Sequence, residues 1–228
     1  MEQMIKITAH SGAEHTADNS LDFVRYALEL AVDALEVDVR RRADGVLALG
    51  HDAADGQSPT LEEVLGLVAA HPSMCINCDL KMPGLEREVA ALAQQAGLVG
   101  RLIFSGTVDA AVCAADPLLH EQAEIYLNIE EYVPDLYVSY RNIPDFELQA
   151  AAKITAVCKQ YGVRTVNINH VLVTRRLVQT LAQEGVGLSA WTVNEASELR
   201  WFLANGVRNI TTREPSLALA LRGEAIQV

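Results

Sequence analysis

The sequence predicts a (β/α)8 TIM barrel in which residues 1–228 form a single domain. Short apolar runs typical of buried strands alternate with longer amphipathic segments about eight times, and 228 residues come close to the usual size of this fold. No glycine-rich phosphate loop follows the first strand, which disfavours an open nucleotide-binding sheet. Hydrophobic residues make up 50% of the chain, enough for one large core.

The predicted elements follow one another in a regular order, and most of the helices carry a start or a stop signal. The second helix begins with the capping box Thr60–Glu63 and ends before Pro72, and later helices end at glycines. The predicted strands are 6–9, 34–39, 75–80, 102–105, 124–129, 165–168, 188–193 and 209–211. The predicted helices are 20–30, 61–71, 85–96, 108–115, 146–161, 175–184, 195–204 and 215–221.

Two segments depart from this rhythm. Asp44-Gly45 is a hairpin-turn signal after the second strand, and the apolar run Val46–Leu49 is expected to return from it as an additional strand. Glu130–Asp145 is irregular and rich in Pro and Tyr, and we expect it to form a loop at the mouth of the barrel. The four cysteines are expected to be free thiols, since the chain shows no export signal.

Charge and hydropathy restrict the possible partners and the location. The chain has 18 Lys and Arg against 30 Asp and Glu, a net charge of −12, which argues against nucleic acid as a partner. The longest stretch without such charged residues, Val64–Cys78, is too short to span a membrane. No signal peptide is recognisable in Met1–Ile7, which carries charges and leads into the first strand, so we expect a cytoplasmic protein.

Three acidic side chains follow the strands toward the end where barrel enzymes place their active sites. Glu36 and Asp38 are two residues apart, so they share one face of their strand while apolar neighbours occupy the other face. Asp79 lies near the end of the next long strand, with Lys81 two residues later. Solvated or ion-paired strand ends would explain each acid singly, and Lys81 could simply neutralise Asp79. Together, three converging carboxylates favour a hard divalent cation.

Two imidazoles and an indole occur at further strand ends. His10 ends the first strand, His51 follows the additional hairpin strand, and Trp191 lies toward the end of the seventh strand. Each histidine alone is more often a hydrogen-bonded structural residue. In combination with the acids, they favour acid–base chemistry, because imidazole gains and loses protons near neutral pH.

These residues and the scaffold signals resemble the glycerophosphodiester phosphodiesterase family, in the same order over nearly the whole chain. The matching segments are His10-Ser11-Gly12, Asp18-Asn19-Ser20, Leu35 to Val39, Asp44-Gly45, His51-Asp52, Pro59 to Leu65, Asp79-Leu80-Lys81, Trp191 to Asn194 and Gly206 to Pro215.

The resemblance implies a metal-dependent TIM barrel that hydrolyses a small-molecule phosphodiester to glycerol 3-phosphate and an alcohol. It implies that the cation is Mg²⁺ or Ca²⁺, with Mn²⁺ a further candidate, and that His10 is the base and His51 the acid, although the sequence alone leaves their order open. The resemblance also implies roles for the remaining candidates: Glu36, Asp38 and Asp79 as metal ligands, and Lys81, Trp191 and Ser11 in substrate binding.

The sequence departs from the family pattern at three places. Ser11 stands where the family usually has arginine, so one neutral hydroxyl replaces a bidentate phosphate donor. Asp79 stands where glutamate is common. The insertion that many relatives carry after His51-Asp52 is reduced to Ala53–Ser58, which predicts a more open site.

Two alternatives follow from these departures and from the wider superfamily. One is a catalytically silent barrel that binds a phosphodiester or a protein, which the changes at Ser11 and Asp79 motivate. The other is a lipid-directed phosphodiesterase of the phospholipase type, although such proteins are typically exported.

Overall fold

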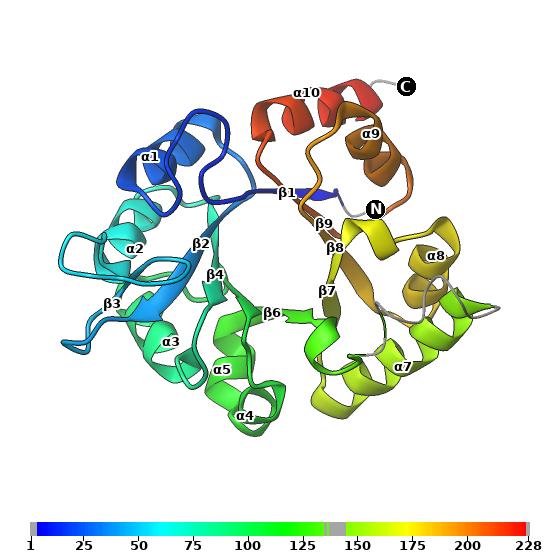
Figure 1. The fold of residues 1–228 in the computed structure, drawn as a ribbon, viewed down its shortest axis with the longest axis horizontal. Helices are drawn as coiled ribbons and strands as arrows, with labels where there is room; N and C mark the ends of the chain where they lie inside the picture. Colours follow the sequence, from blue (N-terminus) through cyan, green and yellow to red (C-terminus); the bar gives the residue numbers. More distant parts are fainter. Residues whose placement is uncertain (1–3, 135, 137–144, 227–228) are drawn as a thin grey trace.

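The computed structural model describes residues 4–134, 136 and 145–226, and in this part of the chain eight parallel strands close into a barrel (Figure 1). Parallel pairing runs around the ring in the order β1-β9-β8-β7-β6-β5-β4-β2, and β1 pairs with β2 to close it. The predicted (β/α)8 barrel in a single domain is thereby confirmed. The barrel strands are β1 (Lys6–Ala9), β2 (Ala34–Arg41), β4 (Cys75–Leu80), β5 (Leu102–Gly106), β6 (Ala123–Asn128), β7 (Thr165–Asn169), β8 (Gly187–Trp191) and β9 (Asn209–Thr212).

The helices form the outer ring, and their starts follow the signals in the sequence. Thr60 and Glu63 make the predicted capping box at the start of α2, and Ser20 caps α1 by accepting from the backbone N–H of Phe23. The helices of this ring are α1 (Leu21–Leu30), α2 (Leu61–Ala69), α3 (Glu86–Gln95), α4 (Ala110–Ala115), α5 (Pro117–Gln122), α7 (Phe146–Tyr161), α8 (Arg175–Gln183), α9 (Ala196–Ala204) and α10 (Pro215–Ile226).

Two helical segments differ from the prediction. The predicted helix 108–115 is shorter, and α5 follows it, because Asp116 caps a new helix whose first residue is Pro117. The last helix continues to Ile226 instead of ending at Leu221. Arg222 explains the extension, since its Nη1 donates to the Ile5 carbonyl 2.8 Å away and pairs with Asp33, which ties α10 to the start of the barrel.

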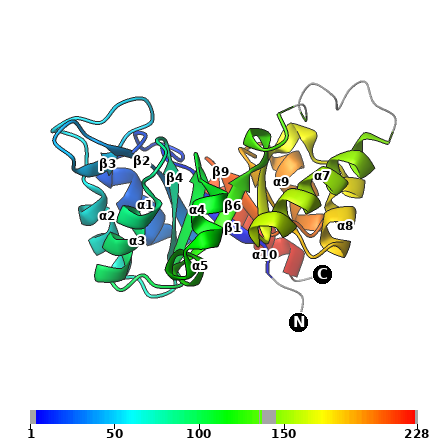
Figure 2. The same cartoon turned by 90° about the horizontal axis from the view of Figure 1, so that it is seen from below.

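The predicted hairpin is also present. β3 (Leu47–Leu49) pairs antiparallel with the far end of β2, outside the closed ring. Seen from the side, the first described residues lie at one edge of the barrel and the β2–β3 hairpin at the opposite edge, where the strands end (Figure 2). The predicted loop 130–145 falls largely outside the described residues. Of its described part, Glu130 and Glu131 belong to the short 3-10 helix η1 (Ile129–Glu131).

Alternation along the strands sorts apolar from polar side chains. Leu35, Val37 and Val39 of β2 are fully buried in a cluster with residues of the surrounding helices, as the two-residue period predicts. Glu36 and Asp38, between them, therefore point toward the barrel axis. The register of β2 and β4 places Glu36 beside Asn77 and Asp38 beside Asp79, which brings the acids of two strands together.

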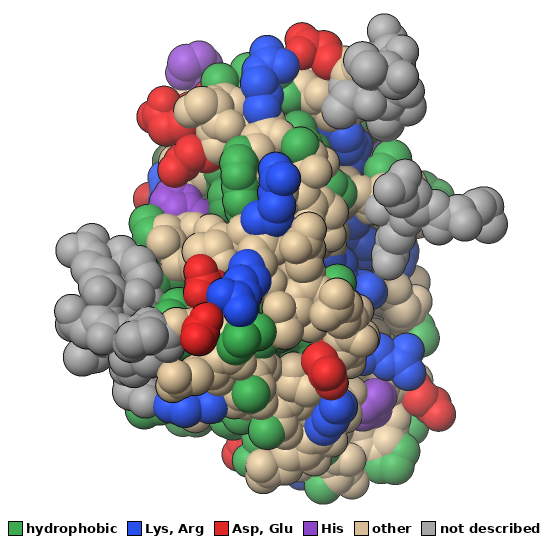
Figure 3. All heavy atoms as spheres, turned by 90° about the vertical axis from the view of Figure 1, so that its right-hand side faces the viewer, with side chains coloured by type: hydrophobic (Ala, Val, Ile, Leu, Met, Phe, Trp, Pro, Cys, Tyr) green, Lys and Arg blue, Asp and Glu red, His purple; other side chains and the backbone are tan. Residues whose placement is uncertain are grey.

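The outer surface carries charges of both signs. On the face over α7, α8 and α9, basic and acidic side chains are interspersed, and several form ion pairs (Figure 3). All four cysteines are free thiols, as predicted. Within the described residues, no helix combines the length and the apolar character that a membrane crossing requires.

Candidate functional site

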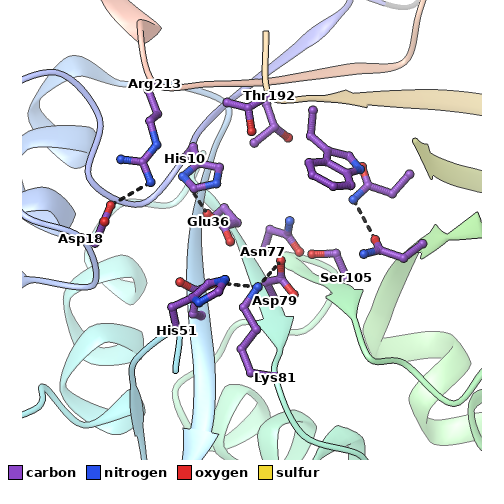
Figure 4. A pocket seen from close by; sticks show the side chains of 15 residues that line it. His10, Asp18, Glu36, His51, Asn77, Asp79, Lys81, Ser105, Thr192 and Arg213 are labelled. Atoms are coloured by element: carbon purple, nitrogen blue, oxygen red, sulfur yellow. Dashed lines mark hydrogen bonds and ion pairs between the residues drawn. The ribbon is translucent and has the colours of Figure 1, made fainter. Parts of the chain in front are cut away.

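A pocket of about 370 Å³ opens at the end of the barrel where the strands terminate. Figure 4 shows side chains from several strand ends and from the connections that follow them converging on this space. The lining residues are His10, Asp18, Glu36, Asp38, His51, Asn77, Asp79, Lys81, Ser105, Asn128, Asn167, Trp191, Thr192, Thr211 and Arg213. Seven of the eight sequence-predicted site residues are among them, and Ser11 is not.

The three predicted carboxylates form a compact cluster. One carboxylate oxygen from each of Glu36, Asp38 and Asp79 lies within 4.8 Å of the others. Burial and the neighbouring negative charges raise the pKa of Glu36 well above its ordinary value. Burial also raises the pKa of Asp79, although the Lys81 ammonium opposes that shift. The cluster therefore concentrates negative charge in a place where water cannot fully solvate it.

The donor set fits a hard divalent cation. Oδ1 of Asp79 and Oδ1 of Asn77 are buried and have no hydrogen-bond partner among the described residues. Gly106 leaves the space for this carboxylate, because a Cβ at its position would lie 1.9 Å from Asp79 Oδ1. Carboxylate and amide oxygens are the ligands that Mg²⁺ and Ca²⁺ prefer, and an ion would satisfy these oxygens.

Lys81 lies between two of the acids. Its Nζ is 2.9 Å from Asp38 Oδ1 and 3.1 Å from Asp79 Oδ2. Burial alone would lower the pKa of Lys81, but the carboxylates of Asp79 and Asp38 outweigh that effect and raise it. Lys81 thus stays charged, and it neutralises two acids rather than Asp79 alone.

Asn19 fixes the orientation of Asp38. Its Nδ2 donates to Asp38 Oδ2 at 2.6 Å, and its Oδ1 accepts from the Asp38 backbone N–H at 2.9 Å. Asn19 adopts a positive φ of 54°, a conformation that asparagine tolerates better than most residues. It belongs to the segment that precedes α1, so the helix cap and the carboxylate clamp are neighbours in sequence, with Ser20 supplying the cap.

His10 lies on the opposite side of the cluster from Lys81 (Figure 4). Its Nδ1 is 2.8 Å from the carbonyl oxygen of Ser11, and because a carbonyl only accepts, Nδ1 carries the proton and Nε2 is the basic nitrogen. The same Nδ1 is 3.8 Å from Glu36 Oε2. Burial lowers the pKa of His10, and the nearby Arg213 charge contributes to the lowering. His10 is therefore neutral at physiological pH in the metal-free protein.

His51 is held more loosely. Its side chain is 66% exposed, and Nδ1 lies 2.8 Å from Asp52 Oδ1, whose own side chain is 94% exposed. The backbone of His51 is anchored because its carbonyl accepts from Arg40 Nε at 2.7 Å. The preceding Gly50 permits the tight turn, since a Cβ there would lie 2.0 Å from the Ala53 carbonyl oxygen. The two histidines thus line one pocket in very different environments.

The far wall combines one indole with two amides. Trp191 ends β8, and its buried Nε1 has no partner within the described part of the chain. Asn167 Nδ2 donates to Asn128 Oδ1 at 2.9 Å, which leaves Asn167 Oδ1 unpaired among those same residues. This wall offers one apolar face and unused polar atoms to a ligand.

Ser11 lies behind the pocket rather than in it. Its side chain is buried, and its Oγ accepts from the Asn19 backbone N–H at 2.6 Å. Its own backbone N–H donates to Glu36 Oε2 at 3.0 Å. Ser11 therefore supports the loop and one acid of the cluster. The geometry does not place its hydroxyl where a substrate would lie.

Sequence reasoning missed Arg213, Asn77 and Asn19 as parts of the site. Arg213 follows the end of β9, and Asn77 is two residues before Asp79 on the same face, so the strand-end rule could have found both. The clamp by Asn19 left no comparable signal, because it depends on how the loop before α1 folds over β2.

Comparisons with known proteins point to the family that the sequence motifs resemble. No family model matches the chain. Two curated relatives match it. A glycerophosphodiester phosphodiesterase of Arabidopsis thaliana is 24% identical over 92% of this chain and 71% of its own length. A glycerophosphodiester phosphodiesterase of Bacillus altitudinis is 25% identical over 97% of this chain and 99% of its own length. The resemblance to this family that the motifs predict is confirmed.

Solved structures of similar proteins show the same fold. A glycerophosphodiester phosphodiesterase from Parabacteroides distasonis superimposes with a TM-score of 0.75 at 18% identity, covering 100% of both chains. An Oleispira antarctica phosphodiesterase, solved in complex with the product sn-glycerol-3-phosphate, has a TM-score of 0.71 at 16% identity, covering 96% of both chains. These likenesses establish the TIM-barrel fold independently of the strand pattern.

Proposed function

We propose, starting from these glycerophosphodiester phosphodiesterase relatives, that this chain hydrolyses glycerophosphodiesters to glycerol 3-phosphate and an alcohol. One observation carries the proposal: three clustered carboxylates and two imidazoles, all expected from the sequence, line a single pocket. The named relatives, one of them a product complex, support an enzyme of the phosphodiesterase class.

A divalent cation would be held by Glu36, Asp38 and Asp79, whose oxygens already lie together. Such an ion supplies electrostatic stabilisation of the negative charge that develops on the phosphoryl group. Mg²⁺ and Ca²⁺ fit an all-oxygen donor set best, and Mn²⁺ tolerates it.

His10 acts as the general base in this proposal. Its Nδ1 proton is committed to the Ser11 carbonyl, and burial keeps the ring neutral, so Nε2 has a free lone pair. In the mechanism implied by the family, the substrate hydroxyl next to the phosphodiester attacks phosphorus. His10 takes the proton of that hydroxyl while the new O–P bond forms.

His51 acts as the general acid. As an imidazolium paired through Nδ1 with Asp52, it carries its second proton on Nε2 and transfers it to the leaving alcohol oxygen as the old P–O bond breaks. The cyclic phosphate that results is opened by water in the reverse sense. His51 then accepts the proton of the water, and His10 returns its proton to the glycerol oxygen.

Substrate placement involves the rest of the pocket. Lys81 lies beside the cluster and contributes positive charge near the phosphate, and the indole of Trp191 provides an apolar wall for the glycerol or the leaving group. The partner is a small-molecule phosphodiester. The identity of the alcohol and a cytoplasmic location stay predictions.

The decisive test is a matrix of metals and diesters. The protein is stripped with a chelator, reloaded separately with Mg²⁺, Ca²⁺ or Mn²⁺, and incubated with a panel that includes glycerophosphocholine, while glycerol 3-phosphate release is followed. We expect release with at least one metal, none after chelation, and a strong loss in His51→Ala. His71→Ala is the matched control, because His71 is an exposed histidine that does not line the pocket.

Two outcomes would replace the proposal. Saturable diester binding without turnover, unchanged in His10→Ala, would favour a catalytically silent barrel. Activity on phospholipid vesicles but not on soluble diesters would favour a lipid-directed enzyme.

A further inference from the structure

The pocket has to hold an anion although it is predominantly acidic. Four carboxylates line it, those of Asp18 and the three clustered acids, against two cationic side chains, those of Lys81 and Arg213. One of the cations, Lys81, is engaged by two carboxylates and its side chain is only 20% exposed. A bound divalent ion would offset part of the negative charge. The other cation, Arg213, is the remaining source of directional donors for a phosphate.

The backbone of Arg213 is fixed by hydrogen bonds through both its N–H and its carbonyl. Its N–H donates to Asn194 Oδ1 at 2.9 Å, and its carbonyl accepts from the Glu14 N–H at 2.8 Å. The residue before it, Thr212, is paired with the end of β1, because the His10 N–H donates to the Thr212 carbonyl at 2.8 Å. Arg213 therefore leaves the barrel directly beside His10, as Figure 4 shows.

The guanidinium has donors to spare. Its Nη2 lies 2.9 Å from Asp18 Oδ1, and Asp18 is the one carboxylate that pairs with it within the described part of the chain. The side chains of Arg213 and Asp18 are 40% and 57% exposed, so water or a ligand can reach both. An exposed ion pair of this kind is weak and can exchange its partner. Nε, Nη1 and the second hydrogen of Nη2 remain as donors for a further acceptor, and the Nε–Nη2 edge that matches two phosphate oxygens becomes fully available when Asp18 is displaced.

The loop opposite is shaped to admit this side chain. Gly12 has a φ of +73°, and a Cβ at its position would lie 1.9 Å from Asp18 Oδ1 and 3.0 Å from Arg213 Nη1. Any larger residue would displace the pair. The buried Ser11 beside it cannot supply the donors, since its hydroxyl bonds to the Asn19 N–H behind the pocket. Arg213, directly after β9, thus places a guanidinium on the side of the pocket where the segment after His10 has no arginine.

We propose that Arg213 binds the non-bridging oxygens of the substrate phosphate and is the phosphate clamp of this protein, with Asp18 holding it ready in the free state. The inference rests on the proposed function for its substrate. Phosphate binding is thereby assigned to the residue after β9, whereas the family resemblance placed it at the residue after His10.

The experiment measures binding separately from catalysis. Affinities for sn-glycerol 3-phosphate, inorganic phosphate and glycerol are determined calorimetrically on the whole protein, both chelated and with Mg²⁺. The variants are Arg213→Gln, Arg213→Lys, Asp18→Asn and, as a matched control with an exposed ion pair far from the pocket, Arg200→Gln. Thermal unfolding of each variant reports the contribution of the ion pair to stability.

We expect Arg213→Gln to weaken binding of both phosphates about tenfold or more, because a charge-assisted bidentate contact is lost. Arg213→Lys keeps the charge without the fork and should fall between. Glycerol binding, and the phosphate affinity of Arg200→Gln, should stay within twofold of the unaltered protein. Asp18→Asn loses the same ion pair but frees the guanidinium, so its phosphate affinity should be equal or higher.

Three results would overturn the inference: phosphate binding in Arg213→Gln within twofold of the unaltered protein, equal weakening in Arg213→Gln and Asp18→Asn, or no measurable phosphate binding at all. The first two would give Arg213 a purely structural role. If only the proposed function is wrong, diester turnover will be absent although phosphate binding still depends on Arg213.

Discussion

The two ends of this barrel both hold charged clusters, and they are built in opposite ways. At the end where the strands begin, Glu124 accepts from Arg208 Nε at 2.8 Å and from Thr165 Oγ1 at 3.2 Å, and it also pairs with Lys6 at 3.4 Å. One acid thus meets two cations and a hydroxyl. At the end where the strands terminate, three clustered acids share Lys81.

The two clusters also differ in how completely their polar atoms are paired. Glu124 has three partners, Thr165 on the neighbouring β7, Lys6 on β1 and Arg208 just before β9, and two of them are cations that offset its charge. In the other cluster, Asp79 Oδ1 has no partner within the described residues, and burial raises the pKa of Glu36. The first arrangement is what stability favours. The second leaves buried negative charge unbalanced, which the proposed cation and substrate would offset.

The largest expected effect follows from removing the proposed base. His10→Ala should lower kcat/KM by about 10²- to 10⁴-fold, the usual contribution of a general base, while the midpoint of thermal unfolding changes little. Steady-state kinetics and a thermal melt check both halves. If the loss of activity only follows a loss of folded protein, then His10 contributes to stability, as the cluster at the other end does, and not to catalysis.

A change at the other end should act on stability alone. Glu124→Ala leaves Arg208 and Lys6 without their acid, and should lower the free energy of unfolding by about 1–3 kcal/mol with kcat unchanged for the folded fraction. Urea unfolding measures it. Glu184→Ala is the matched control, because its ion pair with Lys159 is exposed and worth about 0–1 kcal/mol. Equal losses in both variants would contradict a special role for this cluster.

Removing an acid of the site should raise the free energy of unfolding instead of lowering it. The folded pKa of Glu36 lies above its unfolded value, so its contribution to stability is fully present below the unfolded pKa and is lost as the pH rises through the folded pKa. At pH 7.5, Glu36→Gln should therefore raise the free energy of unfolding of the chelated protein, because a neutral amide replaces a buried charge that its neighbours repel.

The same variant should lose the stabilisation by added Mg²⁺, which thermal melts with and without the metal would detect. Glu62→Gln, at an exposed position on α2, should leave both quantities unchanged. Destabilisation of the chelated Glu36→Gln protein at neutral pH would show that repulsion among the three carboxylates does not lower the stability of the fold.

The smallest expected effect is a displaced pH profile. Burial lowers the pKa of His10 below its ordinary value of 6.5, and a base works only when unprotonated. At saturating metal, kcat/KM should therefore hold as the pH falls to 6.5 and decline only as it passes the lowered pKa. An acidic limb centred at or above 6.5 would argue against His10 as the base.

The sequence alone was sufficient for the barrel and for most of the site. Two-residue spacing placed Glu36 and Asp38 on one face, and the rule that barrel sites lie at strand ends gathered His10, Asp79 and Trp191 around them. These inferences needed only local periodicity, which strands obey wherever they are. The capping box of α2 and the turn of the hairpin succeeded for the same reason, because their hydrogen bonds close within a few residues.

What only the tertiary structure decided was how segments distant in sequence meet. Ser11 lies next to His10 in the chain, yet its side chain turns behind the pocket to the Asn19 N–H, whereas Arg213, some two hundred residues away in sequence, emerges beside His10 because β9 pairs with β1. The strand-end rule could have nominated Arg213 as a site residue, but its place beside His10 depends on barrel closure and loop paths, which no local pattern encodes. The sequence therefore determined which side chains are available to the candidate site, and the fold decided which arginine stands beside them.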